Sequence, residues 1–325
     1  MERALRYLAV ALLCLAGAMA GPGRAWAADD YPSRTITLIC ALPPGSGADV
    51  IVRYFAEQLA KKVPVPVIVE NKPGASGNIA AEFVARSKPD GYTIYLHGAN
   101  TIAANLNRLK NPPFKAEDMQ VVSNVQSQAF MIAVAPGSPA RTLPELTALI
   151  KTKGGNATYG VSNIFAQIVG ELYRIRTGLS ANIVQYRTAA QFMNDLNSGS
   201  LDFAVVDPTF AMAQEREGRL RILGISSSER MPISPHVPTM IEGGVPDMDM
   251  RSWFATMVPA ATPRPVVDKL NGWFNEILAT EETRKFLASA GGIPFIVSAD
   301  EGQAMYLKAN VDYRDYVKQA NITEN

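Results

Sequence analysis

Short apolar runs alternate with amphipathic helical segments along most of the chain. In the first third, strands are predicted at Thr35 to Cys40, Val65 to Val69 and Tyr92 to His97, with helices after Asp49 and Asn78 between them. A parallel pair of strands needs a long crossover, usually a helix, whereas an antiparallel pair needs only a tight turn. The alternation therefore favours an α/β fold with mostly parallel sheets.

A second series of the same kind begins at the apolar run Phe130 to Pro136. The capping box Thr142-x-x-Glu145 predicts a helix over residues 144–151. The segment IFAQIVGELYRIR has one apolar face and predicts a second helix that stops at Gly178. The further strands of this series are predicted at Ala157 to Gly160, Ile183 to Tyr186, Leu201 to Val206 and Leu220 to Ile225.

The chain after about residue 250 has little sheet of its own. It contains the apolar strand SWFATMVP and a short strand at Phe295 to Val297, among helices that begin near Thr280 and at the capping box Ser298-x-x-Glu301. Helices need a sheet to cover, so we expect the chain to return to the first sheet. The predicted division is a leader at residues 1–27, lobe 1 at 28–127 and 249–325, and lobe 2 at 128–248.

The first 27 residues have the pattern of an export signal. Arg3 and Arg6 form a basic start, Tyr7 to Ala20 an apolar core, and Ala25-Trp26-Ala27 a small-x-small cleavage site. A membrane helix is the alternative, but this core is shorter than the roughly 20 residues needed to span a bilayer. We therefore predict an exported chain that is cleaved after Ala27.

Composition narrows the possible functions. Beyond the leader, Cys40 is the one cysteine, so an exported chain must be stabilised by core packing, and Cys40 is predicted to be an inert core residue. A formal net charge of +1, without a basic stripe, argues against a nucleic-acid partner. With only His97 and His236, and no HExxH or GxSxG motif, neither a metal site nor a cofactor is expected. His97 ends a predicted strand, and we expect a hydrogen-bonded structural role for it rather than a ligand contact.

The glycine-rich turn ALPPGSGAD, Ala41 to Asp49, joins a predicted buried strand to a predicted helix. It lacks the Lys and Ser or Thr of a phosphate loop, and Val50 replaces the third glycine of the dinucleotide fingerprint. A helix N-terminus still favours a smaller anion, such as a carboxylate. The amides predicted to be free there are those of Ser46, Gly47, Ala48 and Asp49. Asp49 either caps its own helix or accepts a hydrogen bond from a ligand.

Four segments in order resemble the Bug family of periplasmic solute-binding proteins, which serve tripartite tricarboxylate transporters. They are YPSRTITLICALPPGSGADVIVRYFAEQL, VIVENKPGASGNIAAEFVARSKPDGYTIYL, HVPTMIEGGVP and SWFATMVPAATPRPVVDKLN. The resemblance covers about Tyr31 to the C-terminus. It implies a two-lobed α/β fold of the type II periplasmic-binding-protein kind, with a hinge and an interlobe ligand cleft. It also implies no catalytic residue, and we expect a monomer that binds a small organic carboxylate and meets membrane permease subunits.

The resemblance also implies which residues bind the ligand. In lobe 1 these are Pro44, Gly45, Ser46, Gly47, Ala48 and Asp49, through backbone contacts to one carboxylate, and Gly98, Ala99, Asn100 and Thr101. In lobe 2 they are Val161, Ser162, Asn163, Tyr186, Arg187, Thr188, Asp207 and Pro208. All of these positions lie at the end of a predicted strand or after it, which agrees with ligand binding beyond the carboxyl ends of parallel strands.

Departures from the family pattern bear on the ligand. Leu42 and Ser46 interrupt the usual Phe-Pro-Pro-Gly-Gly, the loop GVSNIFAQ replaces a Gly/Ser/Thr run, and Arg187 stands where Lys is common. A guanidinium can hold a carboxylate with two hydrogen bonds, although Arg187 could also be solvated. With apolar walls from Leu42, Ile164 and Phe165, this predicts a dicarboxylate with an apolar middle, aliphatic or aromatic such as terephthalate. An exported enzyme on a related two-lobed fold and a periplasmic sensor subunit are the alternatives.

Overall fold

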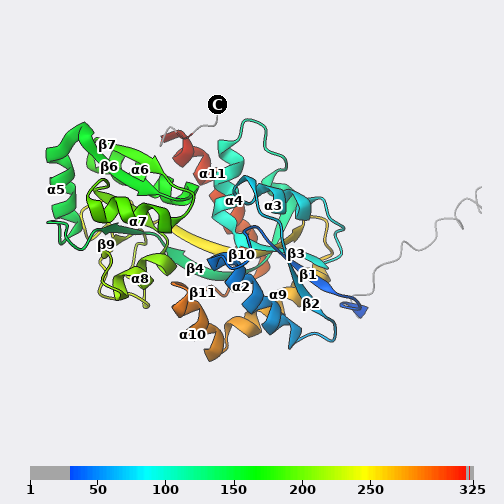
Figure 1. Ribbon diagram of the computed structural model, residues 1–325. Helices are drawn as coiled ribbons and strands as arrows, with labels where there is room; N and C mark the ends of the chain where they lie inside the picture. The colour runs from blue at the N-terminus through cyan, green and yellow to red at the C-terminus, as the bar shows by residue number, and fades with distance from the viewer. Residues whose placement is uncertain (1–29, 320–321, 323–325) are drawn as a thin grey trace, which may run out of the picture.

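The computed structural model describes residues 30–319 and residue 322. The predicted leader, residues 1–27, lies outside the described residues. The chain forms two α/β lobes, each built on its own sheet, with helix α11 and the long strands β4 and β10 between them (Figure 1). None of the helices in the described ranges is long and apolar enough to cross a membrane.

Lobe 1 contains a six-stranded sheet in the order β11-β4-β10-β3-β1-β2. Its strands are β1 (Ile36–Cys40), β2 (Val67–Asn71), β3 (Thr93–Gly98), β4 (Met119–Ala129), β10 (Arg251–Pro259) and β11 (Ile293–Pro294). Its helices are α2 (Gly47–Ala60), α3 (Asn78–Ala85), α4 (Ala99–Arg108), α9 (Arg264–Leu278), α10 (Glu281–Ser289) and α11 (Ala299–Gln319). Helices α2 and α9 bury their apolar residues against one face of this sheet, while α3, α4 and α11 pack in the cluster on the other.

Lobe 2 contains a five-stranded sheet in the order β7-β6-β8-β5-β9. Its strands are β5 (Met131–Val134), β6 (Ala157–Val161), β7 (Ala181–Gln185), β8 (Phe203–Val206) and β9 (Arg221–Ile225). Its helices are α5 (Leu143–Lys153), α6 (Ile164–Thr177), α7 (Ala189–Ser198) and α8 (Pro208–Arg216). Short 3₁₀ turns in the two lobes are η2 (Ala75–Gly77), η3 (Ala116–Asp118) and η4 (Gly154–Asn156).

The expectation of mostly parallel sheets is wrong. Strands β1, β2 and β3 are parallel, as are β6, β7 and β8. However, β10 and β11 run antiparallel to their neighbours in lobe 1, and β5 runs antiparallel to both β8 and β9 in lobe 2. Two of these antiparallel strands, β5 and β10, begin directly after the points where the chain crosses between the lobes.

Strand β4 was not predicted from the sequence, although it pairs with β10 along its whole length. Its second half, residues 123–128, reads SNVQSQ and lacks the apolar run expected of a buried strand, yet these residues are buried. The predicted strand at Phe295 to Val297 is also wrong, because the strand ends at Pro294 and the next three residues are irregular. The expected return of the chain to the first sheet is confirmed by β10, which lies between β3 and β4.

Local capping signals in the sequence are confirmed. Thr142 accepts a hydrogen bond from the Glu145 amide at the start of α5, and Thr280 caps α10 in the same way. Ser298 and Glu301 exchange hydrogen bonds before α11. Gly178 ends α6 in the left-handed conformation, with φ of 65°. Cys40 is buried and unpaired, and burial raises the pKa of its thiol, as expected of a core residue.

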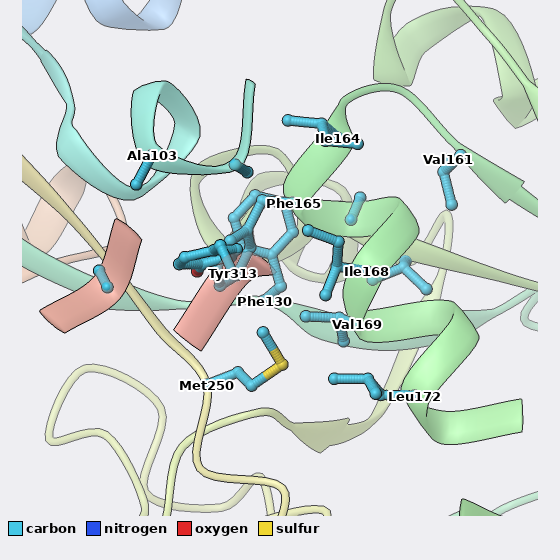
Figure 2. Packing of buried hydrophobic residues seen from close by; sticks show 14 of the residues in the cluster. Ala103, Phe130, Val161, Ile164, Phe165, Ile168, Val169, Leu172, Met250 and Tyr313 are labelled. Atoms are coloured by element: carbon cyan, nitrogen blue, oxygen red, sulfur yellow. The ribbon is translucent and has the colours of Figure 1, made fainter. Parts of the chain in front are cut away.

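The chain crosses between the lobes at two points, Phe130 and Met250, which are tied together by Ser226. The Ser226 hydroxyl accepts a hydrogen bond from the Phe130 amide and donates one to the Met250 carbonyl. One apolar cluster continues across this hinge: Phe165 of α6 packs between Phe130 and Tyr313 of α11 (Figure 2). The lobes therefore share part of one core on the α6 side.

Candidate ligand-binding site

The loop between β1 and α2 is held closed by the Asp49 carboxylate. One carboxylate oxygen accepts hydrogen bonds from the Gly45 amide and the Arg53 guanidinium, each at 2.8 Å, and the other accepts one from the Asn71 side chain at 2.8 Å. The Arg53 hydrogen bond is the main reason that the pKa of Asp49 falls to about 2. The carboxylate is nearly inaccessible to solvent, so Asp49 shapes the loop and is not free to accept from a ligand.

Only part of this loop can offer amides to an anion. The Gly45 amide is taken by Asp49, the Ser46 amide donates to the Pro43 carbonyl, and the Asp49 amide donates to the Ser46 hydroxyl. Pro44 has no N–H group. Within the described residues, Gly47 and Ala48, the first two residues of α2, have no acceptor for their amides. The expectation of four free amides is therefore wrong for Ser46 and Asp49.

The second predicted loop of lobe 1 follows β3. Gly98 is the N-cap of α4, and Ala99, Asn100 and Thr101 form its first turn, with no side chain capping them. Strand β3 pairs directly with β1, so this helix start lies beside the Gly47 loop at the same edge of the sheet. Gly98 and Ala99 are buried, whereas Thr101 is partly exposed.

His97 lies just before this loop with its ring buried. It makes edge-to-face contacts with Tyr95 and Phe254, and its Nδ1 has no hydrogen-bond partner among the described residues. Burial lowers the pKa of His97 to about 4, so the ring is neutral near pH 7. The structure therefore gives His97 a packing role, with no hydrogen bond at Nδ1 in the described part of the chain.

In lobe 2, the loop after β6 forms the start of α6. Asn163 caps the helix by accepting a hydrogen bond from the Ala166 amide, while Val161 is buried and Ser162 is partly exposed. Within the described residues, the amides of Ile164 and Phe165 have no acceptor. The Phe165 side chain is 1% exposed and packs in the interlobe cluster, so it is not available as a cleft wall.

In the loop after β7, the Tyr186 side chain is hydrogen-bonded within lobe 2, whereas the Arg187 side chain has no acceptor among the described residues. The Tyr186 hydroxyl donates to Asp195 at 2.6 Å, and burial together with this carboxylate raises the pKa of Tyr186 to about 12. Thr188 caps α7 with Gln191, whose side chain accepts from the Arg187 and Thr188 amides. The Arg187 guanidinium is exposed and has no acceptor in the described part of the chain.

The loop after β8 starts α8. Asp207 is the N-cap, and its carboxylate accepts a hydrogen bond from the Phe210 amide at 3.0 Å. Burial raises the pKa of this carboxyl, and the amides at the helix start partly offset that rise. Pro208 is buried at the first helical position, which suits proline because that position needs no N–H donor.

Two of the lobe 2 loops, those at the starts of α6 and α8, lie at the boundary between the lobes. The three loops of lobe 2 are neighbours because their strands pair in the order β7-β6-β8. Helix α6 contacts α4 and α11, with Phe165 at its start against Tyr313, and the start of α8 contacts residue 290 of lobe 1. For Arg187, the described residues provide no contact with lobe 1. A separate hollow of about 230 Å³ between the start of β10 and α11 is lined by none of the predicted site residues.

Two residues of this site were missed in the sequence, Arg53 and Asn71. Arg53 stands four residues after Asp49 on the same helix, a spacing typical of an ion pair, so it could have been found. Asn71 lies on another strand, and only the pairing of β1 with β2 brings it to Asp49. No group of three or more His, Cys, Asp or Glu side chains in the described ranges could hold a metal ion.

Comparison with known proteins decides the family. The sequence profile described as "Tripartite tricarboxylate transporter family receptor" matches residues 51–316. The chain belongs to this receptor family. Protein BugT of Bordetella pertussis is 32% identical over 288 residues, which cover 87% of this chain and 88% of BugT. The Bug resemblance predicted from the four sequence segments is thus confirmed.

Solved structures agree in fold. R. palustris Rpa4515 with adipate matches with a TM-score of 0.82 and 26% identity, over 90% of this chain and 99% of that one. The periplasmic binding protein BugD matches with a TM-score of 0.78 and 26% identity, over 91% of this chain and all of its own. Such relatives are receptors and binding proteins, not enzymes, so the chain is a solute-binding receptor with the two-lobed periplasmic-binding-protein fold.

Proposed function

We propose that the receptor binds a small dicarboxylate with an apolar middle, either aliphatic or aromatic, in the periplasm, and delivers it to the permease subunits of a tripartite tricarboxylate transporter. The observation that carries this proposal is that the backbone amides of Gly47 and Ala48 have no acceptor among the described residues. These two residues start α2, next to the loop that Asp49 fixes. Amides at a helix start bind anions well, and hydrogen bonds to a charged group contribute about 1.5 to 3 kcal/mol each.

The second carboxylate is assigned to Arg187 on lobe 2. Its guanidinium follows β7 at the carboxyl edge of the sheet and is not neutralised by any acidic residue in the described part of the chain. The adipate in Rpa4515 supports this reading, since adipate carries two carboxylates separated by methylene groups. An aromatic dicarboxylate such as terephthalate also carries a carboxylate at each end of an apolar middle and belongs to the proposed class.

The proposed division of the chain supports a closing mechanism. We propose residues 28–127 and 249–325 for lobe 1 and residues 128–248 for lobe 2, with β4 continuing the sheet of lobe 1 as far as Ala129. A ligand that contacts both lobes stabilises the closed arrangement over the open one by its extra contacts. We expect the receptor to act as a monomer, with its leader cleaved after Ala27.

A ligand panel tests the proposed function directly. The protein is purified from periplasmic extract, where its N-terminus should be Ala28, and its melting temperature is measured with dicarboxylates of increasing length, terephthalate, citrate and hexanoate. A ligand at 100 times its dissociation constant should stabilise the protein by about 2.7 kcal/mol. The dicarboxylates should give the largest shifts. Equal melting temperatures with and without every carboxylate would contradict the proposal.

Replacement of Arg187 by alanine tests the two-ended grip. Binding of adipate should weaken by about 10-fold to 100-fold, because a charged hydrogen-bonded contact to the second carboxylate is lost, while hexanoate binding should change little. Isothermal titration calorimetry gives both constants. Arg219→Ala, at another exposed arginine of lobe 2, is the matched control. An equal loss for adipate and hexanoate would show that Arg187 does not contact the second carboxylate.

A further inference from the structure

The turn after α10 contacts the start of α8 in the opposite lobe. The Thr209 hydroxyl donates a hydrogen bond of 2.5 Å to the Ala290 carbonyl. The same carbonyl accepts a hydrogen bond from the Gln126 side chain on β4, at 3.3 Å. Because Ala290 caps the C-terminal end of α10, one carbonyl at a helix end joins a residue of lobe 2 to a residue of lobe 1.

Two successive glycines make this contact possible. A Cβ atom on Gly291, whose φ is +73°, would lie 2.6 Å from the Thr209 amide nitrogen and 2.8 Å from the Pro208 carbonyl carbon. These are backbone atoms of the other lobe, which cannot move aside as a flexible side chain can. A Cβ on Gly292 would lie 2.1 Å from the Gln126 side-chain nitrogen, so the turn also packs closely against β4 of its own lobe.

We propose that residues 290–292 form an interlobe latch that positions the start of α8, and with it Asp207 and Pro208, for ligand binding. Thr209 and Gly291 are then positioning residues, since they act through the loop after β8 rather than by touching the ligand. The effect on affinity rests on the proposed function. The contact between the lobes does not, so the two can be tested separately.

The latch and the apolar cluster lie at different helix starts of lobe 2. At the start of α6, Phe165 packs against Tyr313 of lobe 1. At the start of α8, Thr209 contacts the latch, residues 290–292. Ile293, which follows the latch on β11, also packs against the apolar cluster of lobe 2. Loss of the latch should therefore separate the lobes on the α8 side alone, with both lobes still folded.

The main test inserts a methyl group into the contact. Gly291→Ala is compared with Gly178→Ala, because Gly178 has a similar φ of +65° but no atom within 4 Å of its Cβ position. Both variants place an alanine at a similar positive φ, and only the first places an atom between the lobes. Spin labels at Lys285→Cys on α10 and Glu217→Cys after α8 report the interlobe distance, while Cys40 is buried and should stay unlabelled.

Without ligand, Gly291→Ala should show a longer distance between the labels than the unmodified chain, and Gly178→Ala should not. Adipate binding should weaken at least about tenfold in Gly291→Ala alone. Unchanged distance and affinity in Gly291→Ala would overturn the latch. If the unmodified protein binds no carboxylate, the proposed function fails, but the distance measurement still decides whether the latch exists.

A second pair of variants covers the case in which Gly291→Ala does not fold. Thr209→Val removes the hydroxyl donor and keeps the shape, whereas Thr209→Ser keeps the donor. The loss of one such hydrogen bond should weaken adipate binding by about fivefold and broaden the label distances in Thr209→Val. Thr209→Ser should resemble the unmodified chain. Identical behaviour of the two variants would overturn the role of the hydrogen bond.

Discussion

Replacing Gly47 with proline should reduce the affinity for carboxylates by about 10-fold to 100-fold while leaving the fold intact. Proline has no N–H, so the variant loses one of the two amides without an acceptor at the start of α2. A hydrogen bond to a charged group is worth about 1.5 to 3 kcal/mol, and 1.4 kcal/mol corresponds to a tenfold change. The proline ring would also occupy the space in front of the missing N–H, where an anion would sit.

The backbone at this position can accept proline. Gly47 is the first residue of α2, a position at which proline is favoured, and the preceding Ser46 has φ of −71° and ψ of 160°. That extended conformation is the one that a residue before proline prefers. A Cβ on Gly47 would meet no atom within 4 Å, so added bulk has room. The melting temperature without ligand should therefore change little.

Calorimetric titration with adipate and with hexanoate measures the effect, and Gly47→Ala is the matched control because it adds a carbon but keeps the N–H. Both ligands should bind more weakly to the proline variant, since each has the carboxylate that the loop would hold. Near-normal affinity of Gly47→Pro would show that the carboxylate is anchored elsewhere. An equal loss in Gly47→Ala would mean that bulk, not the amide, limits binding.

Much of the fold could be predicted from the sequence because its signals are local. Apolar runs gave β1, β3, β6 and β10 within a few residues, and single capping residues gave the starts of α5 and α10. Strand β4 could not be found this way. Its Ser123 and Gln126 are buried because Asn275 of α9 and the turn at Ala290 pack against them, which is a property of the tertiary structure and not of the segment.

The candidate site was harder to predict, because its chemistry depends on hydrogen bonds within the loop. The sequence indicates a helix start after β1 but does not say which amides are already satisfied. In the structure, the amides of Gly47 and Ala48 remain without an acceptor among the described residues. The Gly45 amide donates to the Asp49 carboxylate, and the Asp49 amide donates to the Ser46 hydroxyl. Arg187 stays a prediction, as the described residues contain neither a partner for it nor a contact across the cleft.

Removing the carboxylate of Asp49 should disturb both stability and binding. In Asp49→Ala, the Gly45 amide loses its acceptor, the Asn71 side chain loses one of its two acceptors, and Arg53 loses its ion-pair partner. Arg53 is half exposed, so the ion pair itself is weakened by solvent, and we expect the free energy of unfolding to fall by roughly 1 to 3 kcal/mol. The loop that presents Gly47 would no longer be fixed, so adipate affinity should fall at least about tenfold.

The control for this variant is Asp268→Ala. Asp268 pairs with Arg264 at the same four-residue spacing on α9, but its side chain is exposed, so its loss should cost less than about 0.5 kcal/mol and leave binding unchanged. Urea unfolding gives the stabilities, and calorimetry gives the affinities. Equal stability and affinity in the two variants would show that the β1 to α2 loop keeps its shape without Asp49.

The pH dependence provides an independent check on the same carboxylate. The pKa of Asp49 is lowered to about 2 in the folded chain from an ordinary value of 3.8. The folded state therefore holds this proton less tightly than the unfolded state, so the contribution of Asp49 to stability is fully present above about pH 4. That contribution should disappear as the pH falls through 2.

The stability difference between the unmodified chain and Asp49→Ala should accordingly be constant from pH 7 to about pH 5 and shrink below pH 4. A difference that stays constant at acid pH would mean that the carboxylate is not held by Arg53 and the loop amide. The Asp49 carboxylate would then not be the group that fixes the loop presenting the Gly47 and Ala48 amides.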